Sequence, residues 1–221
     1  RAEPIGQQML DTLYTGLVQD ARLGMQAAHA LRVLTLHSRL VSPSRGFVVR
    51  RLYRQRAMET MLVALTKELE GRRTAREPCL VAMATLLPGA TDALVSMHLP
   101  TWLPLLVHTL GMDDAPVRLT CARTLQRIVS RDHAAALLEH LPLLVPRLLE
   151  AAATPQAPRL RVAALQALQA LTDAVPAAHL DAYRRAVVQA LGRPRRGVDD
   201  AVRAVRTAAV DCRAAWYATQ E

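Results

Sequence analysis

Three stretches of similar sequence follow one another toward the C-terminal end of the chain. The first runs from His98 to Val129, and the pattern begins again at His140 and at His179, so the starts lie 42 and then 39 residues apart. In the first stretch an apolar segment with Leu99, Leu103, Leu106 and Leu110 at helical spacing precedes a turn and a second apolar segment, and the other two stretches repeat this order. One such helix pair cannot bury its apolar face alone, so neighbouring pairs must stack.

A period of about 40 to 47 residues with two helices per unit is typical of HEAT and armadillo arrays. The sequence therefore predicts an all-α fold, an α-solenoid of about five helical hairpins. We expect a single array over residues 1–221, and its approximate repeats are 5–40, 48–88, 98–130, 139–173 and 179–217. Because the chain opens at Arg1 with neither Met nor a signal peptide, we expect a fragment of a longer protein.

The repeated His-Leu motifs predict where the first helices begin. We expect Pro100 and Pro142 to lie at helix starts, where the missing N–H costs nothing. His98, His140 and His179 would then share one structural position at those starts. Residues 93–97 are expected to form a short turn ahead of the first repeat.

Acidic residues in the turns predict a ladder of ion pairs. The expected pairs are Asp113 or Asp114 with Arg118, and Asp199 or Asp200 with Arg203. The middle repeat offers no carboxylate to Arg161, because its turn reads Thr154-Pro155-Gln156. We interpret the three arginines as scaffold residues.

Motifs that carry chemistry are absent from the sequence. Cys79, Cys121 and Cys212 lie far apart and form no C-x-x-C pair, so we interpret them as small buried residues in a reducing compartment. The sequence has no Gly-rich phosphate loop, no G-x-S-x-G and no H-E-x-x-H, which predicts no enzyme, no cofactor and no metal site. No uncharged apolar run of about 18 residues stands out, so we expect no membrane span.

The sequence predicts a partner-binding surface on helix faces. The formal charge is +9, which suits phosphates or acidic partners, although a GC-rich coding bias toward Ala and Arg explains it as well. Arginines crowd the start of the helix expected over 48–70, where the helix dipole disfavours them, and second helices usually line the groove of a solenoid. The candidate binding residues are Arg50, Arg51, Arg54, Arg56, Arg123, Arg127, Gln166, Gln169, Arg206 and Arg213.

Several runs together resemble one known family. They are RRLYRQRAMETM from Arg50 to Met61, the Leu- and Pro-rich segments between Leu99 and Leu149, RLRVAALQALQALTDAVP from Arg159 to Pro176, and the tail from Val188 to Tyr217. They resemble the C-terminal HEAT region of the methyl-methanesulfonate-sensitivity nucleotide-excision-repair protein family, the large targeting subunit of cytosolic iron–sulfur protein assembly. The likeness extends over nearly the whole chain.

The resemblance implies a non-enzymatic adaptor in the cytoplasm and the nucleus. It implies docking onto a small cluster-handling subunit and a WD-repeat propeller, and help in recruiting iron–sulfur apoproteins such as DNA helicases, primase and polymerases. Two other classes stay open. A nucleic-acid-binding solenoid would lose affinity steeply with salt, and a nuclear-transport-type scaffold would bind an acidic or extended peptide. A homodimer is also compatible with the sequence.

Overall fold

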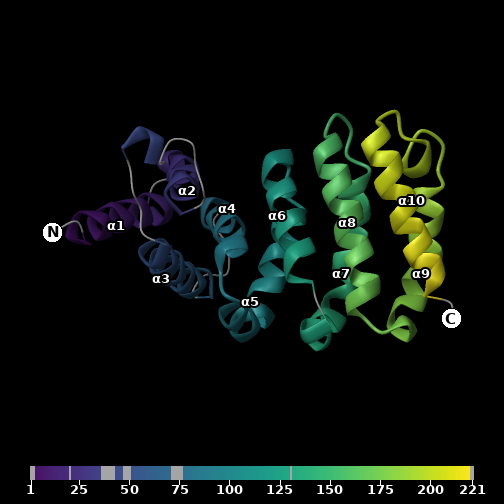
Figure 1. The fold of residues 1–221 in the computed structure, drawn as a ribbon, viewed down its shortest axis with the longest axis horizontal. Coiled ribbons are helices and arrows are strands. Elements are labelled where there is room, and N and C mark those ends of the chain that lie inside the picture. The colour runs from purple at the N-terminus through teal and green to yellow at the C-terminus, as the bar shows by residue number, and fades with distance from the viewer. Residues whose placement is uncertain are drawn as a thin grey trace. The chain divides into compact units, whose positions relative to one another are not determined.

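The computed structural model describes residues 3–19, 21–35, 43–46, 51–70, 77–129 and 131–219, and most of these are helical. These residues form ten α-helices and no strand, which confirms the all-α prediction (Figure 1). The helices are α1 (Glu3–Gln19), α2 (Ala21–Thr35), α3 (Arg51–Glu70), α4 (Glu77–Leu86), α5 (Asp92–Leu110), α6 (Ala115–Ile128), α7 (Ala134–Ala152), α8 (Pro158–Ala174), α9 (Ala177–Leu191) and α10 (Arg203–Ala218). Short 3-10 turns cover Pro43–Arg45, Leu87–Gly89, Arg131–His133 and Gly197–Asp199.

The chain divides into two compact units, Arg1–Leu105 and Leu106–Glu221, with the boundary inside α5. In the first unit α1 packs against α2, and α2 packs against α4, which also contacts α3. Leucines at helical spacing close this core; Leu17, Leu31, Leu62, Leu65 and Leu80 are almost completely buried. The continuity of the two units as one array stays a prediction.

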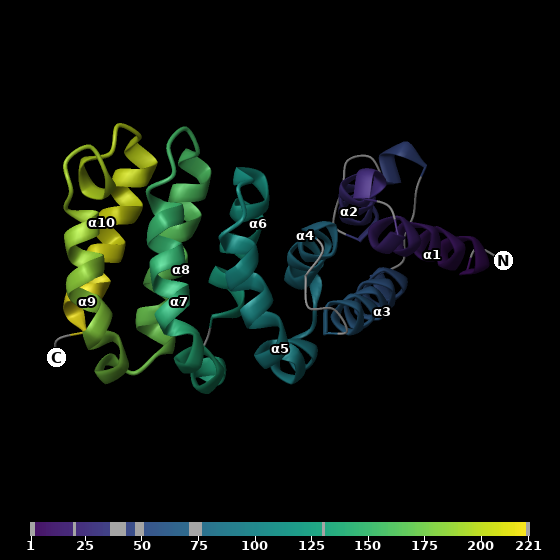
Figure 2. The same cartoon turned by 180° about the vertical axis from the view of Figure 1, so that it is seen from behind.

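The second unit shows the predicted solenoid directly. The hairpins α7/α8 and α9/α10 follow one another, and the second helices α6, α8 and α10 pack side by side (Figures 1 and 2). Leu125, Leu165 and Leu168 are fully buried, and the indole N–H of Trp216 donates to the Leu168 carbonyl at 3.0 Å. The apolar faces of successive hairpins therefore form a continuous core.

The prediction that prolines begin the first helices is wrong. Pro100 and Pro104 lie inside α5, and Pro142 and Pro146 lie inside α7, which begins at Ala134. All four side chains are exposed, so water can hydrogen-bond the carbonyls four residues earlier that lose an N–H partner. The helices tolerate these prolines because they occupy the solvent side.

Two linked expectations about this region are also wrong. Residues 93–97 belong to α5 and form no turn, so His98 and His140 lie within helices while His179 lies near the start of α9. His98 instead stacks on Trp102, with ring centroids 5.2 Å apart. α5 therefore begins at Asp92 and α7 at Ala134, ahead of the expected repeat starts at 98 and 139.

The expectation that no long apolar run is present also needs correction. α5 has 19 residues and is long and apolar enough, by length and composition, to cross a membrane. Its side chains Leu99, Trp102 and Leu103 are core residues of the protein. Core helices pass the same test, so this property of α5 is weak evidence for a membrane.

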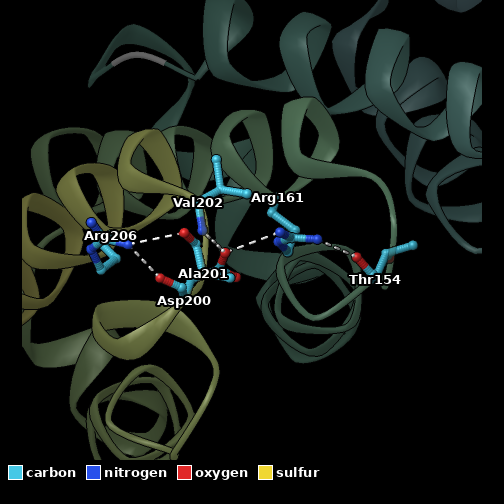
Figure 3. A network of polar contacts seen from close by, with 6 residues as sticks. All are labelled: Thr154, Arg161, Asp200, Ala201, Val202 and Arg206. Atoms are coloured by element: carbon cyan, nitrogen blue, oxygen red, sulfur yellow. Dashed lines mark hydrogen bonds and ion pairs between the residues drawn. The ribbon is translucent and has the colours of Figure 1, made fainter.

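Among the described residues the two expected ion pairs within a repeat do not form, and the ion pair that is present joins successive repeats (Figure 3). Arg161 in α8 donates from Nη2 to Asp200 Oδ1 of the next repeat at 3.0 Å, and from Nη1 to the Thr154 carbonyl at 3.0 Å. Asp200 Oδ1 also accepts the Val202 N–H at 2.8 Å. Arg161 therefore has a carboxylate partner after all, and Asp200 does not pair with Arg203.

The turn between α5 and α6 makes different contacts. Asp114 caps α6 by accepting the Val117 N–H at 2.9 Å, and Arg118 donates to the Leu110 carbonyl at 2.9 Å. Ala157 stands at the cap of α8, where Asp114 stands in α6. The turn before α8 has no carboxylate to offer, and Arg118 of the preceding repeat donates to a backbone carbonyl. Arg161 has its carboxylate partner in the turn of the following repeat.

Candidate functional site

A groove of about 600 Å³ lies between the outward faces of α8 and α10. Its lining is mixed, with amides, a guanidinium, a carboxylate and a hydroxyl above small apolar side chains. The lining residues are Val162, Gln166, Gln169, Arg203, Ala204, Thr207, Ala208 and Asp211. Such a surface offers a protein partner hydrogen-bond donors and acceptors, and one positive and one negative side chain.

Helical periodicity places these side chains on one face. Arg203, Thr207 and Asp211 follow one another at four-residue spacing along α10, so they form a stripe. The opposite face of α10 is buried through Val205 and Cys212. Burial of the apolar stripe against α8 therefore fixes which polar residues of α10 face the groove.

The structure brings only some of the predicted residues together. Gln166 and Gln169 line the groove as expected. Arg206 instead donates to the Asp200 and Ala201 carbonyls at 2.8 and 3.1 Å (Figure 3). Arg213 lies over the Tyr217 ring, 5.3 Å from its centroid. Neither arginine lines the groove.

Arg203, Thr207 and Asp211 line the groove but are absent from the predicted set. The signal that could have identified them is the spacing of the buried residues Val205, Ala209 and Cys212, which places 203, 207 and 211 on the outward side of the helix.

α6 carries the remaining predicted residues of the second unit. Arg123 and Arg127 are exposed, while Val117, Ala122 and Leu125 are buried. The exposed side of α6 is therefore basic.

The predicted arginines of the first unit have different surroundings. Arg50 lies outside the described residues, and Arg51 is the first residue of α3. Arg54 is half-buried, whereas Arg56 is exposed. Of the described side chains in this set, Arg56 is the better placed to meet a partner.

The three cysteines are buried thiols that form no disulfide with one another. Burial raises the pKa of the Cys212 thiol to about 12 and raises that of Cys121 still further, so both stay protonated thiols at neutral pH. The Cys121 thiol donates to the Leu106 carbonyl at 3.0 Å. Within the described parts of the chain, no three His, Cys, Asp or Glu side chains are grouped to hold a metal ion.

Comparison with known proteins gives the family of this chain. Residues 1–172 match the family model for the MMS19 C-terminal region, described as "RNAPII transcription regulator C-terminal". The MMS19 nucleotide excision repair protein homolog of Bos taurus is 30% identical over 219 residues, which cover 98% of this chain and 21% of the relative. The homolog of Homo sapiens is 30% identical over 204 residues, covering 91% of this chain and 19% of the relative.

A fungal relative shows the same pattern of coverage. The DNA repair/transcription protein mms19 of Schizosaccharomyces pombe is 26% identical over 216 residues, which cover 97% of this chain and 20% of the relative. The chain thus spans about a fifth of the length of the curated relatives that it matches. From the family match and the helical-repeat fold together, the chain belongs to the MMS19 family.

Proposed function

We propose that this chain is a non-enzymatic adaptor, a docking region of the cytosolic iron–sulfur targeting complex that helps to deliver clusters to apoproteins of DNA replication and repair. Its partners would be a small cluster-handling subunit and a WD-repeat propeller, and the recipients would include DNA helicases, primase and polymerases. The names of its relatives, which refer to DNA repair and transcription, support this setting. The proposal places the chain in both cytoplasm and nucleus.

The observation that supports the proposal most is the groove between α8 and α10, where polar side chains stand beside a largely apolar surface. A stack of helical hairpins puts its apolar side chains inside and presents long, regular faces to partners. Gln166 and Gln169 from one repeat and Arg203 and Asp211 from the next lie on one such face. Amide, guanidinium and carboxylate groups at this spacing suit the polar side chains and backbone of a bound protein.

Co-purification tests the proposal. The chain, mixed with the purified small cluster-handling subunit and the WD-repeat propeller, is expected to elute with them as one complex. Arg203→Glu reverses a charge in the groove and is expected to weaken capture about tenfold. Arg185→Glu makes the same charge change at an exposed position of α9 outside the groove, and should leave capture unchanged.

Circular dichroism of both variants confirms that the helices are intact. Absence of any complex with the wild-type chain contradicts the adaptor proposal. Equal capture by both variants would show that the groove is not part of the interface and that the partner binds another face.

A nucleic-acid-binding solenoid is the second candidate, favoured by exposed Arg123 and Arg127 on α6. This function predicts binding of duplex or single-stranded DNA at low salt, with affinity that falls linearly on a logarithmic salt scale. Arg123→Glu combined with Arg127→Glu should then abolish binding in a mobility-shift titration. Undetectable binding at low salt excludes this candidate.

A further inference from the structure

A second cleft, of about 440 Å³, lies between α7 and α9 and shares no lining residue with the α8/α10 groove. Its lining is apolar along the two helices and basic in the loop that follows α9. The apolar lining includes Pro146, Leu149, Ala186 and Ala190, and the exposed Arg193 and Arg196 form a basic rim. The small alanines of α9 leave the space that forms the cleft.

An exposed apolar stripe leads along α7 into this cleft. Pro142, Pro146 and Leu149 follow one another at helical spacing, so they lie on one side of the helix. Beside them, Leu143 is 63% exposed. The prolines add no N–H donors to the stripe, but each leaves the carbonyl four residues earlier without its helical N–H partner. A partner that covers the stripe with an apolar side chain must therefore leave these carbonyls to water or supply a donor to them.

The charge at the rim is positive. Arg193 and Arg196 are exposed, and Arg195 lies between them in the loop. Glu150 is the acidic residue of the cleft, and its carboxylate already accepts a hydrogen bond from Arg147 Nη1 at 2.8 Å. The rim is thus complementary to carboxylates brought by a partner.

The loop that carries these arginines is folded into a defined shape. Gly197 has φ +53°, and a Cβ atom there would lie 2.2 Å from the Leu191 carbonyl oxygen. The Arg196 N–H donates to the Arg193 carbonyl at 3.2 Å, and Asp199 accepts the Arg195 N–H at 2.8 Å. Because the loop backbone is already ordered, binding loses less conformational entropy there.

We propose that the α7/α9 cleft binds an acidic peptide segment of a protein partner. One large aliphatic side chain of the segment fills the cleft over Pro146 and Leu149, and flanking carboxylates pair with Arg193 and Arg196. Within the described residues 131–219, the side chains lining the cleft include no aromatic ring on which a base could stack, which favours a peptide over single-stranded nucleic acid. The inference does not depend on which complex the chain joins.

Fluorescence anisotropy with the complete chain tests this inference. The probe is a labelled synthetic peptide with a central leucine pair flanked by glutamates, and the control peptide carries lysines in place of the glutamates. The acidic peptide is expected to bind, whereas the lysine peptide is not. Arg193→Glu with Arg196→Glu should weaken binding at least about tenfold. Ala190→Trp, which fills the cleft, should weaken it as well.

The matched control is Arg123→Glu with Arg127→Glu, an equal charge change at exposed positions of α6 that should leave peptide binding unchanged. Equal losses in the two double variants would show a general charge effect and overturn the inference. So would binding of the lysine peptide, or full binding by a folded Ala190→Trp variant. Displacement of the peptide by the partner subunits is not required, so failure here leaves the adaptor proposal intact.

Discussion

Asp200 shows how much a single buried carboxylate can determine in this fold. Its side chain is 7% exposed and that of Arg161 is 13% exposed, so both charges are largely removed from water. Two hydrogen bonds from other groups end on one oxygen of Asp200, and its backbone carbonyl accepts from Arg206 (Figure 3). One residue therefore joins α8 to the turn that begins α10.

We expect Asp200→Ala to lower the free energy of unfolding by about 3 kcal/mol, because it leaves the Arg161 guanidinium buried without its carboxylate partner. Urea titration followed by circular dichroism measures the loss. Asp199→Ala is the matched control, since Asp199 is exposed and accepts one hydrogen bond, from the Arg195 N–H; its loss should be about 1 kcal/mol or less. Equal losses for both variants would contradict the ladder.

The buried thiol of Cys212 predicts a pH dependence in the alkaline range. Burial raises its pKa from 9.0 to about 12 in the folded chain, whereas the unfolded chain keeps the ordinary value. The stabilisation that the protonated Cys212 thiol gives the fold is therefore complete below about pH 9. It decreases as the pH rises toward 12, because the unfolded chain loses this proton first. Unfolding titrations below pH 9 and near pH 11 should show less decline in Cys212→Ala than in the wild type; parallel declines would contradict the assignment.

At the scale of elements, the prolines inside α5 and α7 weaken the helix locally and add apolar surface. Pro146 lies on the solvent side of α7, where it removes a hydrogen bond to the Pro142 carbonyl. Its exposed ring also forms part of the apolar stripe beside the α7/α9 cleft.

Pro146→Ala should raise the free energy of unfolding by about 1 to 3 kcal/mol, because alanine restores the missing N–H and has the highest helix propensity. Pro158→Ala serves as the control. Pro158 lies at the first residue of α8, where proline already suits a helix start, so its replacement should give no gain. Thermal unfolding measures both changes, and a loss of stability in Pro146→Ala would contradict this account.

The loop between α9 and α10 depends on one glycine. Gly197→Ala would place Cβ 2.2 Å from the Leu191 carbonyl oxygen at a positive φ, so we expect a loss of at least about 2 kcal/mol. Gly192→Ala is the comparison within the same loop, because its φ is −87° and the nearest atom to an added Cβ lies 3.5 Å away. Denaturant titrations that gave equal losses at both positions would contradict this account of the loop.

At the scale of the whole chain, the boundary between the two compact units falls inside α5. Each unit contains one of the two tryptophans, Trp102 and Trp216, and both are fully buried. α5 contributes residues to both units, so its unfolding would disrupt both.

We therefore expect coincident transitions. In Trp102→Phe the fluorescence of Trp216 reports on the second unit, and in Trp216→Phe that of Trp102 reports on the first. In each variant the fluorescence midpoint in urea should equal the midpoint from circular dichroism. Separate midpoints would show that the units unfold independently and that coupling between neighbouring repeats is weak at α5.

The sequence alone determined the fold class. A repeated helical spacing of apolar residues specifies helix pairs, and neighbouring pairs must stack to bury their apolar faces, independently of the loops between them. It also indicated the family, which the comparisons confirm. Buried faces such as Val117, Ala122 and Leu125 on α6 followed from helical periodicity.

Only the tertiary structure decided which groups meet. The partner of Arg161 is Asp200, 39 residues later, and sequence spacing within one repeat could not reveal a contact between two repeats. The sequence around Pro142 resembles a helix start. Packing of α7 against its neighbours nevertheless extends the helix back to Ala134, with the proline inside it. The apolar spacing of α10 gives its outward face, but that α8 borders this face beside Arg203, and that Arg206 reaches the Asp200 carbonyl, follows only from the packing of the two helices and the turn.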